Sequence, residues 1–510
     1  MAKKKNSSRQ KSPEDAAKRL KEEKLAILHA KVRQEMVQRR ILAVNEMAAN
    51  RTKLHFLSST EVATGPVEIF DRFPIEVMRQ IFRELTDIDS LHSLISASRS
   101  FHECYINDQY QCEVFCKMLV DEMTLPIFLQ AVAISSDSVR RIRWTGQWTG
   151  AFQNVREFMD QYSTDSRATT YDGSSYNMRT LLSIAEFHLI IKAVTRDFFE
   201  SCLNLHPWTH ERYEKSELGR HEELRIQRAF YNLELYVRLF KRGDYYLIEQ
   251  TLLNERLHGI IRGRQIVGQE IYEAFFNHFS FWELEEIVSV KDYMEREYNG
   301  VINECKDSLA KSSQAQQYGS PSTLKRILEA GNIKLGSCDD FRKHYNEFNR
   351  TFINKGVEFF WKVCNQNGPK TKIPLIDIPI QQDTIILSTQ FTKIVTIHYY
   401  LIDQALNNQQ SQIETSEYLR FLDCYDRSPE SRAGQLDFPS APFTYSFIRF
   451  FMISQTYCFR DCWSSWGYCM WDTERLHHIQ DIFWPTGNPL RLSHGPRTRL
   501  SSRVVLLPAL

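Results

Sequence analysis

The amino-acid sequence predicts an all-α protein in which a small three-helix domain precedes a large, irregular helical region. The 510 residues include 19 glycines and 16 prolines, well below the roughly 12% that these residues average together, and this composition favours helices over turn-rich β structure. Apolar residues recur at helical spacing in most segments. No segment repeats with a period of roughly 20–50 residues, which argues against horseshoe and propeller architectures. The length provides room for two or three domains.

Residues 1–50 are predicted to form a basic, amphipathic helical arm. Pro13, Glu14 and Asp15 suit a helix start, where acidic side chains complement the helix dipole. Residues 1–40 contain thirteen Lys or Arg and five Asp or Glu. The favoured interpretation is a solvated, partly disordered arm. A nuclear-import patch, a contact with anionic partners and a coiled-coil strand are the alternatives.

Residues 51–69 are predicted to be a linker, broken by Gly65-Pro66, and residues 70–120 a compact helical domain. Pro74 is expected at the first position of a helix. Asp89 is expected to cap a second helix. After a turn at 98–100, a third apolar stretch runs from Phe101 to Phe115. So small a bundle cannot bury all its apolar side chains by itself, so part of that surface must meet the rest of the chain or a partner.

The region 70–120 resembles an F-box. The residues that carry the resemblance are Phe73-Pro74-x-Glu76-Val77, Ile81-Phe82-x-x-Leu85, Asp89-Ser90-Leu91-x-x-Leu94 and Ala97-Ser98-Arg99-x-Phe101. Phe73 stands where the family usually has leucine, and Ala97 where valine is commoner; both replacements remain apolar. An ordinary helical hairpin within a larger α-domain is the alternative to this interpretation.

The resemblance implies an adaptor without catalytic residues or cofactor, which docks on a Skp-type adaptor and through it on the cullin of a ubiquitin ligase. Residues 121–510 would then recruit an unknown protein substrate. The side chains expected to be divided between the bundle core and the adaptor interface are Phe73, Pro74, Ile75, Val77, Ile81, Leu85, Leu91 and Leu94. The alternatives are an F-box scaffold outside a ligase, and a nuclear protein that binds nucleic acid through its basic arm.

The region 121–510 is predicted to consist mainly of helices. Helices are expected at Met178–Leu205, at His221–Lys241 (with apolar residues around most of its circumference) and near 269–296, 338–364 and 443–482. A flexible loop is expected at 308–323 and an extended connector at 368–380, because the latter contains three prolines. The β-branched stretch near 384–400 leaves a minor β element open, although a buried helix is favoured.

A second resemblance lies in the same region. The runs RIQRAFYNLELYVRLF at 225–240 and WGYCMWDTERL at 466–476 are similar to segments of filamentous-fungal F-box proteins with long helical C-terminal regions. This resemblance implies an all-α recruitment domain whose target is unassigned.

Several groups of residues partly resemble metal-binding or phosphate-binding motifs. For each group a structural role is favoured over a chemical one. The group Cys458, Cys462, Cys469, His477 and His478 lacks the two close ligand pairs of a zinc site, and its cysteines lie in an apolar run. Pro207 separates His206 from His210, and no glutamate follows the first histidine. The glycines at 259, 263 and 268 do not form a phosphate-binding loop. No catalytic, cofactor-binding or metal-binding residue is therefore assigned.

The formal net charge of +1 selects neither nucleic acid nor membrane as a partner. Nucleic-acid binding through the arginines and tryptophans at 140–148 is disfavoured, because arginine stems often pack over aromatic rings. No apolar run approaches the roughly 18 residues of a membrane span, and no secretory signal follows the N-terminal lysines. The 11 cysteines are expected to be free thiols. The expected location is cytoplasmic, nuclear or both.

Overall fold

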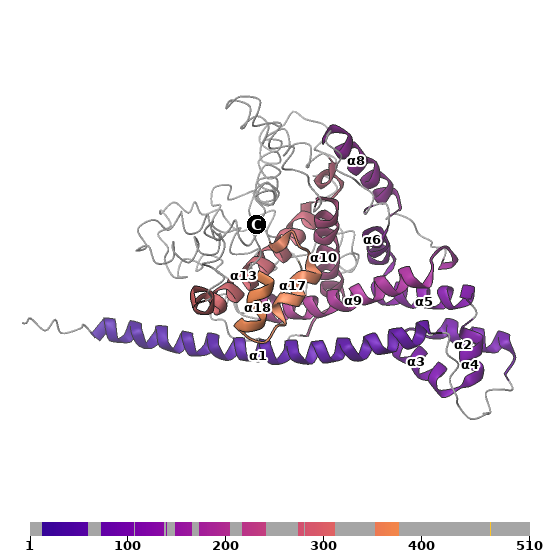
Figure 1. Ribbon diagram of the computed structural model, residues 1–510, viewed down its shortest axis with the longest axis horizontal. Helices are drawn as coiled ribbons and strands as arrows, with labels where there is room; N and C mark the ends of the chain where they lie inside the picture. The colour runs from indigo at the N-terminus through magenta and orange to yellow at the C-terminus, as the bar shows by residue number, and fades with distance from the viewer. Residues whose placement is uncertain are drawn as a thin grey trace, which may run out of the picture. The chain divides into compact units, whose positions relative to one another are not determined.

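The computed structural model describes residues 13–59, 73–106, 108–136, 139, 148–165, 173–204, 217–240, 274–279, 281–311, 352–376 and 470. These residues form helices and connecting turns without a strand, so the predicted all-α class is confirmed (Figure 1). The helices are α1 (Pro13–Ser58), α2 (Ile75–Glu84), α3 (Ile88–Ala97), α4 (Arg99–Tyr105), α5 (Asp108–Met123), α6 (Leu125–Ser135), α8 (Trp148–Asp165), α9 (Met178–Phe198), α10 (Arg220–Phe240), α13 (Phe281–Lys311), α17 (Val357–Cys364) and α18 (Pro369–Ile376).

The chain divides into two compact units, Met1–Asn50 and Arg51–Leu510. Helix α1 covers the described part of the predicted arm and continues through residues 51–58, which were predicted as linker and belong to the second unit. This short segment packs against the neighbouring bundle. The Phe56 ring lies 5.0 Å from His92 and 5.9 Å from His102, and the Gln111 side chain donates a hydrogen bond to the Leu57 carbonyl at 2.8 Å.

Helices α2, α3 and α4 pack together within the region 70–120, and their boundaries differ from those expected from the sequence. Pro74 is the N-cap of α2 and precedes the first helical residue by one position. Asp87, not Asp89, caps α3, because its carboxylate accepts the Ser90 N–H at 2.7 Å. The hydrogen bonds from the Ser90 backbone and side chain hold the pKa of Asp87 below its usual range. Asp89 lies inside α3, where it pairs with Lys53 at 2.6 Å.

The predicted third stretch, Phe101 to Phe115, is two helices. Ser98 caps α4 by accepting the Phe101 N–H at 3.4 Å, and α4 ends at Tyr105 before α5 begins at Asp108. The break allows aromatic rings from both helices to surround the fully buried Phe82, whose ring lies 5.5–6.0 Å from those of Phe101, Tyr105 and Tyr110. Helical periodicity alone could not show this break, since apolar residues continue on both sides of it.

Helix α10 is the central helix of the larger region, as its apolar circumference predicted. Helices α6, α9 and α13 pack against it, and nearly all its side chains are buried, polar ones included. The predicted helix from Met178 is also confirmed: α9 continues as a π-helical turn, η3 (Phe199–Leu203), and residue 205 lies outside the described residues.

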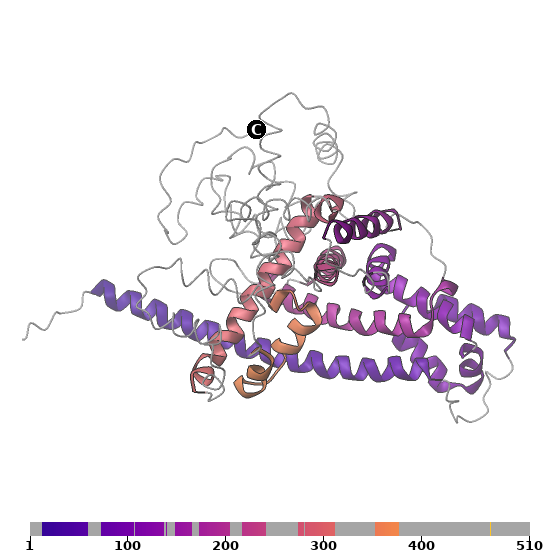
Figure 2. The ribbon, with the colours of Figure 1, turned by 45° about the horizontal axis from the view of Figure 1, so that its top comes forward.

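The prediction of an extended connector at 368–380 is wrong for residues 369–376, which form α18. Pro369 occupies the first helical position, where its missing N–H removes no hydrogen bond, and only Pro374 lies inside the helix. Both views place α17 and α18 (orange) beside α13 (salmon) (Figure 1; Figure 2). There Lys372 pairs with Glu304 at 2.6 Å, and Ile376 is buried. Packing therefore overrides the unfavourable effect of the internal proline.

Two glycines with positive φ allow a matched test of this packing. Gly356 (φ +86°) precedes α17, and a Cβ placed there would lie 2.5 Å from the Glu234 carboxylate, which accepts the Val357 N–H. Gly368 (φ +81°) precedes α18 and has no atom within 4 Å of that position. Gly356→Ala is expected to lower the free energy of unfolding by about 3 kcal/mol, and Gly368→Ala by about 1 kcal/mol, because the first variant combines backbone strain with a displaced carboxylate.

Urea unfolding of the two variants would measure this difference. Equal losses would mean that backbone strain alone matters, and that the bond from Val357 to Glu234 adds nothing.

Candidate protein-binding surface

Large apolar side chains are exposed at the beginning of α2. Among the described residues, six large hydrophobic side chains are exposed, and three of them fall within five positions: Phe73 (38%), Ile75 (44%) and Val77 (42%). Pro74, between the first two, is also exposed. The buried face of α2 is formed by Met78 and Phe82, so the residues before Met78 extend beyond the bundle core. We call Phe73, Pro74, Ile75 and Val77 the α2 surface.

The structure divides the eight residues predicted from the sequence. Four form the α2 surface. Ile81, Leu85 and Leu94 are half-buried, while Leu91 is fully buried and belongs to the bundle core. Val77 and Ile81 are four residues apart, so they lie along one side of α2, and Ile75 lies on another side; Leu85 follows the helix as its C-cap.

The backbone of Leu85 makes two hydrogen bonds. Its N–H donates to the Phe82 carbonyl at 3.3 Å, and its own carbonyl accepts a hydrogen bond from Lys117 at 3.1 Å. Lys117 in turn pairs with Asp121 at 2.5 Å. The C-terminal end of α2 is therefore fixed to α5.

The α2 surface is suited to binding by burial of apolar area. Its four residues carry no ionisable side chain. Full burial of a Val, Ile or Phe side chain contributes about 1.5–3 kcal/mol relative to exposure. A partner that covers this surface could therefore gain several kcal/mol.

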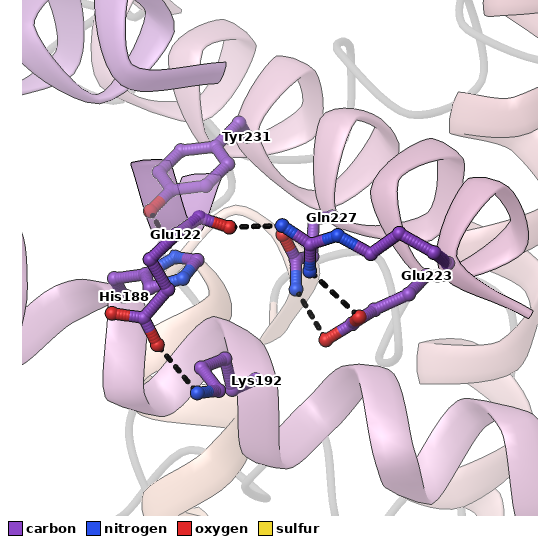
Figure 3. A network of polar contacts seen from close by, with 7 residues as sticks. Glu122, His188, Lys192, Glu223, Gln227 and Tyr231 are labelled. Atoms are coloured by element: carbon purple, nitrogen blue, oxygen red, sulfur yellow. Dashed lines mark hydrogen bonds and ion pairs between the residues drawn. The ribbon is translucent and has the colours of Figure 1, made fainter. Parts of the chain in front are cut away.

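A second cluster of polar side chains joins α5, α9 and α10 (Figure 3). Lys192 pairs with the Glu122 carboxylate at 2.5 Å, and His188 Nδ1 lies 3.0 Å from the Tyr231 hydroxyl. Arg220 donates to the Glu122 carbonyl. Its guanidinium pairs with Glu223 at 2.8 Å, and Glu223 also accepts from the Gln227 amide at 3.1 Å.

The charges in this cluster are set by burial and by close pairing. Burial lowers the pKa of His188 to about 4 and raises the pKa of Tyr231 well above its usual value. Burial alone would raise the pKa of Glu122, but His188, Lys192 and Arg220 together hold it below its usual range. The imidazole and the phenol are therefore neutral near pH 7. His188 and Tyr231 are almost completely buried, and the cluster acts as a polar clamp between three helices.

The sequence analysis missed this clamp. In the sequence His188 lies among the apolar residues of a predicted helix, and its spacing of four residues from Lys192 is the one local signal. The partners in α5 and α10 are distant in sequence, so no local pattern could identify them.

The residues that resemble metal-binding, phosphate-binding or nucleic-acid-binding motifs lie outside the described residues, except for the backbone of Trp148 in α8. In the part of the chain that the structure describes, no three or more His, Cys, Asp and Glu side chains are grouped to hold a metal ion. No single described helix has both the length and the apolar composition to span a membrane; the pair Tyr110–Met123 and Leu125–Ser135 passes that test together but is bent by 116°.

One hydrogen bond connects the first of the two runs that carry the second resemblance with Met470, the single described residue of the second run. The fully buried Arg225, at the start of the first run, donates to the carbonyl of Met470, in the second run, at 3.3 Å. Met470 is itself fully buried. Comparison of the chain with protein-family models, with curated proteins and with solved structures finds no match.

Proposed function

We propose that this protein is an F-box adaptor, a non-catalytic subunit that recruits substrates to a Skp–cullin–F-box ubiquitin ligase. The observation that carries the proposal is the exposure of Phe73, Pro74, Ile75 and Val77. These residues open the run of sequence that resembles an F-box, and a bundle of this size needs a partner to bury them.

In the proposed arrangement, the α2 surface and the half-buried residues beside it dock on a Skp-type adaptor. Leu91 supports that surface from the bundle core. The helices from 121 onward hold an unidentified protein substrate near the ubiquitin-conjugating enzyme. The protein then contributes proximity, and its partners perform the bond-making chemistry.

The test is binding of the purified full chain to a purified Skp-type adaptor. Phe73→Ser combined with Val77→Ser is expected to weaken binding about a hundredfold, because two buried apolar side chains together contribute roughly 3 kcal/mol or more. Both side chains are exposed in the free protein, and the melting temperature of the variant would show whether it remains folded.

Leu42→Ser is the matched control. Leu42 is an exposed aliphatic residue of α1 (67% exposed), outside the F-box-like region. It is expected to leave binding unchanged. Wild-type binding by the Phe73/Val77 variant, or absence of binding by the wild-type chain, would overturn the proposed interface.

A second assay separates a ligase subunit from a scaffold. A reconstituted ligase containing the full chain should ubiquitinate proteins that co-purify with it, and the Phe73/Val77 variant should not. Adaptor binding without ubiquitination of any associated protein would favour the scaffold alternative.

A further inference from the structure

A second exposed apolar stripe lies on α1, in the first unit. Val37 is 46% exposed and Val44 is 39% exposed, with the half-buried Ile41 between them. Intervals of four and three residues place these side chains on one side of the helix. We call Val37, Ile41 and Val44 the α1 stripe. Leu42 is more exposed than any of them, at 67%, but points in another direction.

The α1 stripe lies in the most basic part of the helix. From Lys24 to Asn45 the sequence contains five Lys or Arg and one acidic residue, Glu35. Glu35 lies 3.9 Å from Arg39 on the same helix. Arg33 and Arg40 precede Val37 and Val44 by four positions, an interval that places each arginine position beside the stripe.

We propose that the α1 stripe binds an amphipathic helix of another protein that carries acidic residues beside its apolar face. The apolar side chains of the two helices would pack together, and the acidic residues would lie against the basic flank of α1. A second copy of α1 fits less well, because pairing the stripes would bring like charges together. Nucleic acid would use the positive charge but would gain nothing from exposed valines.

The proposal is tested by fluorescence anisotropy with the full chain and a labelled synthetic heptad peptide. The probe has leucine at its apolar positions and glutamate at the flanking positions. A matched peptide with lysine in place of glutamate serves as the charge control. The acidic peptide is expected to bind and the basic peptide is not.

Val37→Lys combined with Val44→Lys separates apolar packing from simple charge attraction. The variant adds two positive charges, so a purely electrostatic contact would become tighter. If apolar packing at Val37 and Val44 holds the acidic peptide, its binding is expected to weaken about tenfold, which corresponds to about 1.4 kcal/mol. Leu42→Lys adds the same kind of charge away from the stripe and is expected to leave binding within about twofold of wild type.

Lysine is a good helix former, so α1 should persist in all variants, and circular dichroism would check this. Equal or tighter peptide binding by the Val37/Val44 variant would overturn the proposal. Binding of both peptides alike would do the same. Tight binding of a DNA duplex that the two lysines strengthen, without acidic-peptide binding, would replace it with a nucleic-acid contact.

Discussion

Arg228→Met is expected to lower the free energy of unfolding by about 3–5 kcal/mol, because it leaves a buried carboxylate without its partner. Arg228 of α10 and Glu286 of α13 are both buried, and the guanidinium donates three short hydrogen bonds to the carboxylate. Arg228 Nε lies 3.0 Å from Glu286 Oε2, and Nη2 lies 2.7 Å from each Glu286 oxygen. The pair joins the central helix to its longest described neighbour.

Chemical denaturation would measure this loss, with Arg99→Met as the matched control. Arg99 and Glu103 have an equally short contact of 2.7 Å, but both side chains are about half exposed. Exposed pairs contribute about 0–1 kcal/mol, so Arg99→Met should cost little. Burial raises the pKa of Glu286 to about 7 even beside Arg228. The double variant Arg228→Met with Glu286→Leu is expected to recover most of the lost stability, because it removes the buried carboxyl group that the single variant leaves without its hydrogen bonds. A loss for Arg228→Met as small as that for Arg99→Met would show that the buried pair is not important for stability.

The protein is expected to lose stability between about pH 6.5 and pH 4, in part through His188. Burial lowers the pKa of His188 from 6.5 to about 4. Nδ1 meets the Tyr231 hydroxyl, and Nε2 has no hydrogen-bond partner among the described residues that could stabilise a second N–H. In this pH range the unfolded chain binds a proton at this position and the folded chain does not, so acid favours unfolding. The shift corresponds to a loss on the order of 3 kcal/mol.

His188→Gln is the test, since glutamine can still bond to Tyr231 but cannot titrate. The variant is expected to be less stable than wild type at pH 7 and to lose less stability than wild type on acidification to pH 4. Glu122 contributes acid sensitivity of the same sign, because a lowered carboxyl pKa also favours unfolding as pH falls. His188 is one of the groups that lower the pKa of Glu122, so His188→Gln also reduces this contribution, and both effects make the variant less sensitive to acid. Identical pH profiles would show that His188 does not titrate as its burial implies.

The sequence by itself determined the helical class and several of the long helices. Low glycine and proline content and helical periodicity predicted α9 and α10. The apolar circumference of residues 225–240 also predicted that α10 is buried. These properties depend on neighbours three and four residues apart, which a sequence displays directly.

The sequence could not predict which residue caps α3 or that residues 369–376 form a helix, because more than one local structure was compatible with each segment. Asp87 and Asp89 are both plausible N-caps of α3. Asp87 is the cap in the structure, because its carboxylate accepts the hydrogen bond from the Ser90 N–H. The prolines at 369 and 374 argued against α18, yet packing on α13 keeps that segment helical. In both cases the decisive contact is a property of the folded backbone.

The α2 surface shows most clearly the difference between what the sequence predicts and what the tertiary structure decides. The sequence identified the eight apolar residues of the F-box-like run, but only the tertiary structure separated the exposed Phe73, Ile75 and Val77 from the buried Leu91. That separation depends on what covers each side chain, including α5 and the last turns of α1, which are distant in sequence. The polar clamp around Glu122 and the buried pair of Arg228 with Glu286 likewise join separate helices. Periodicity specifies which face of a helix is apolar, whereas burial of a given side chain depends on the elements that fold against it.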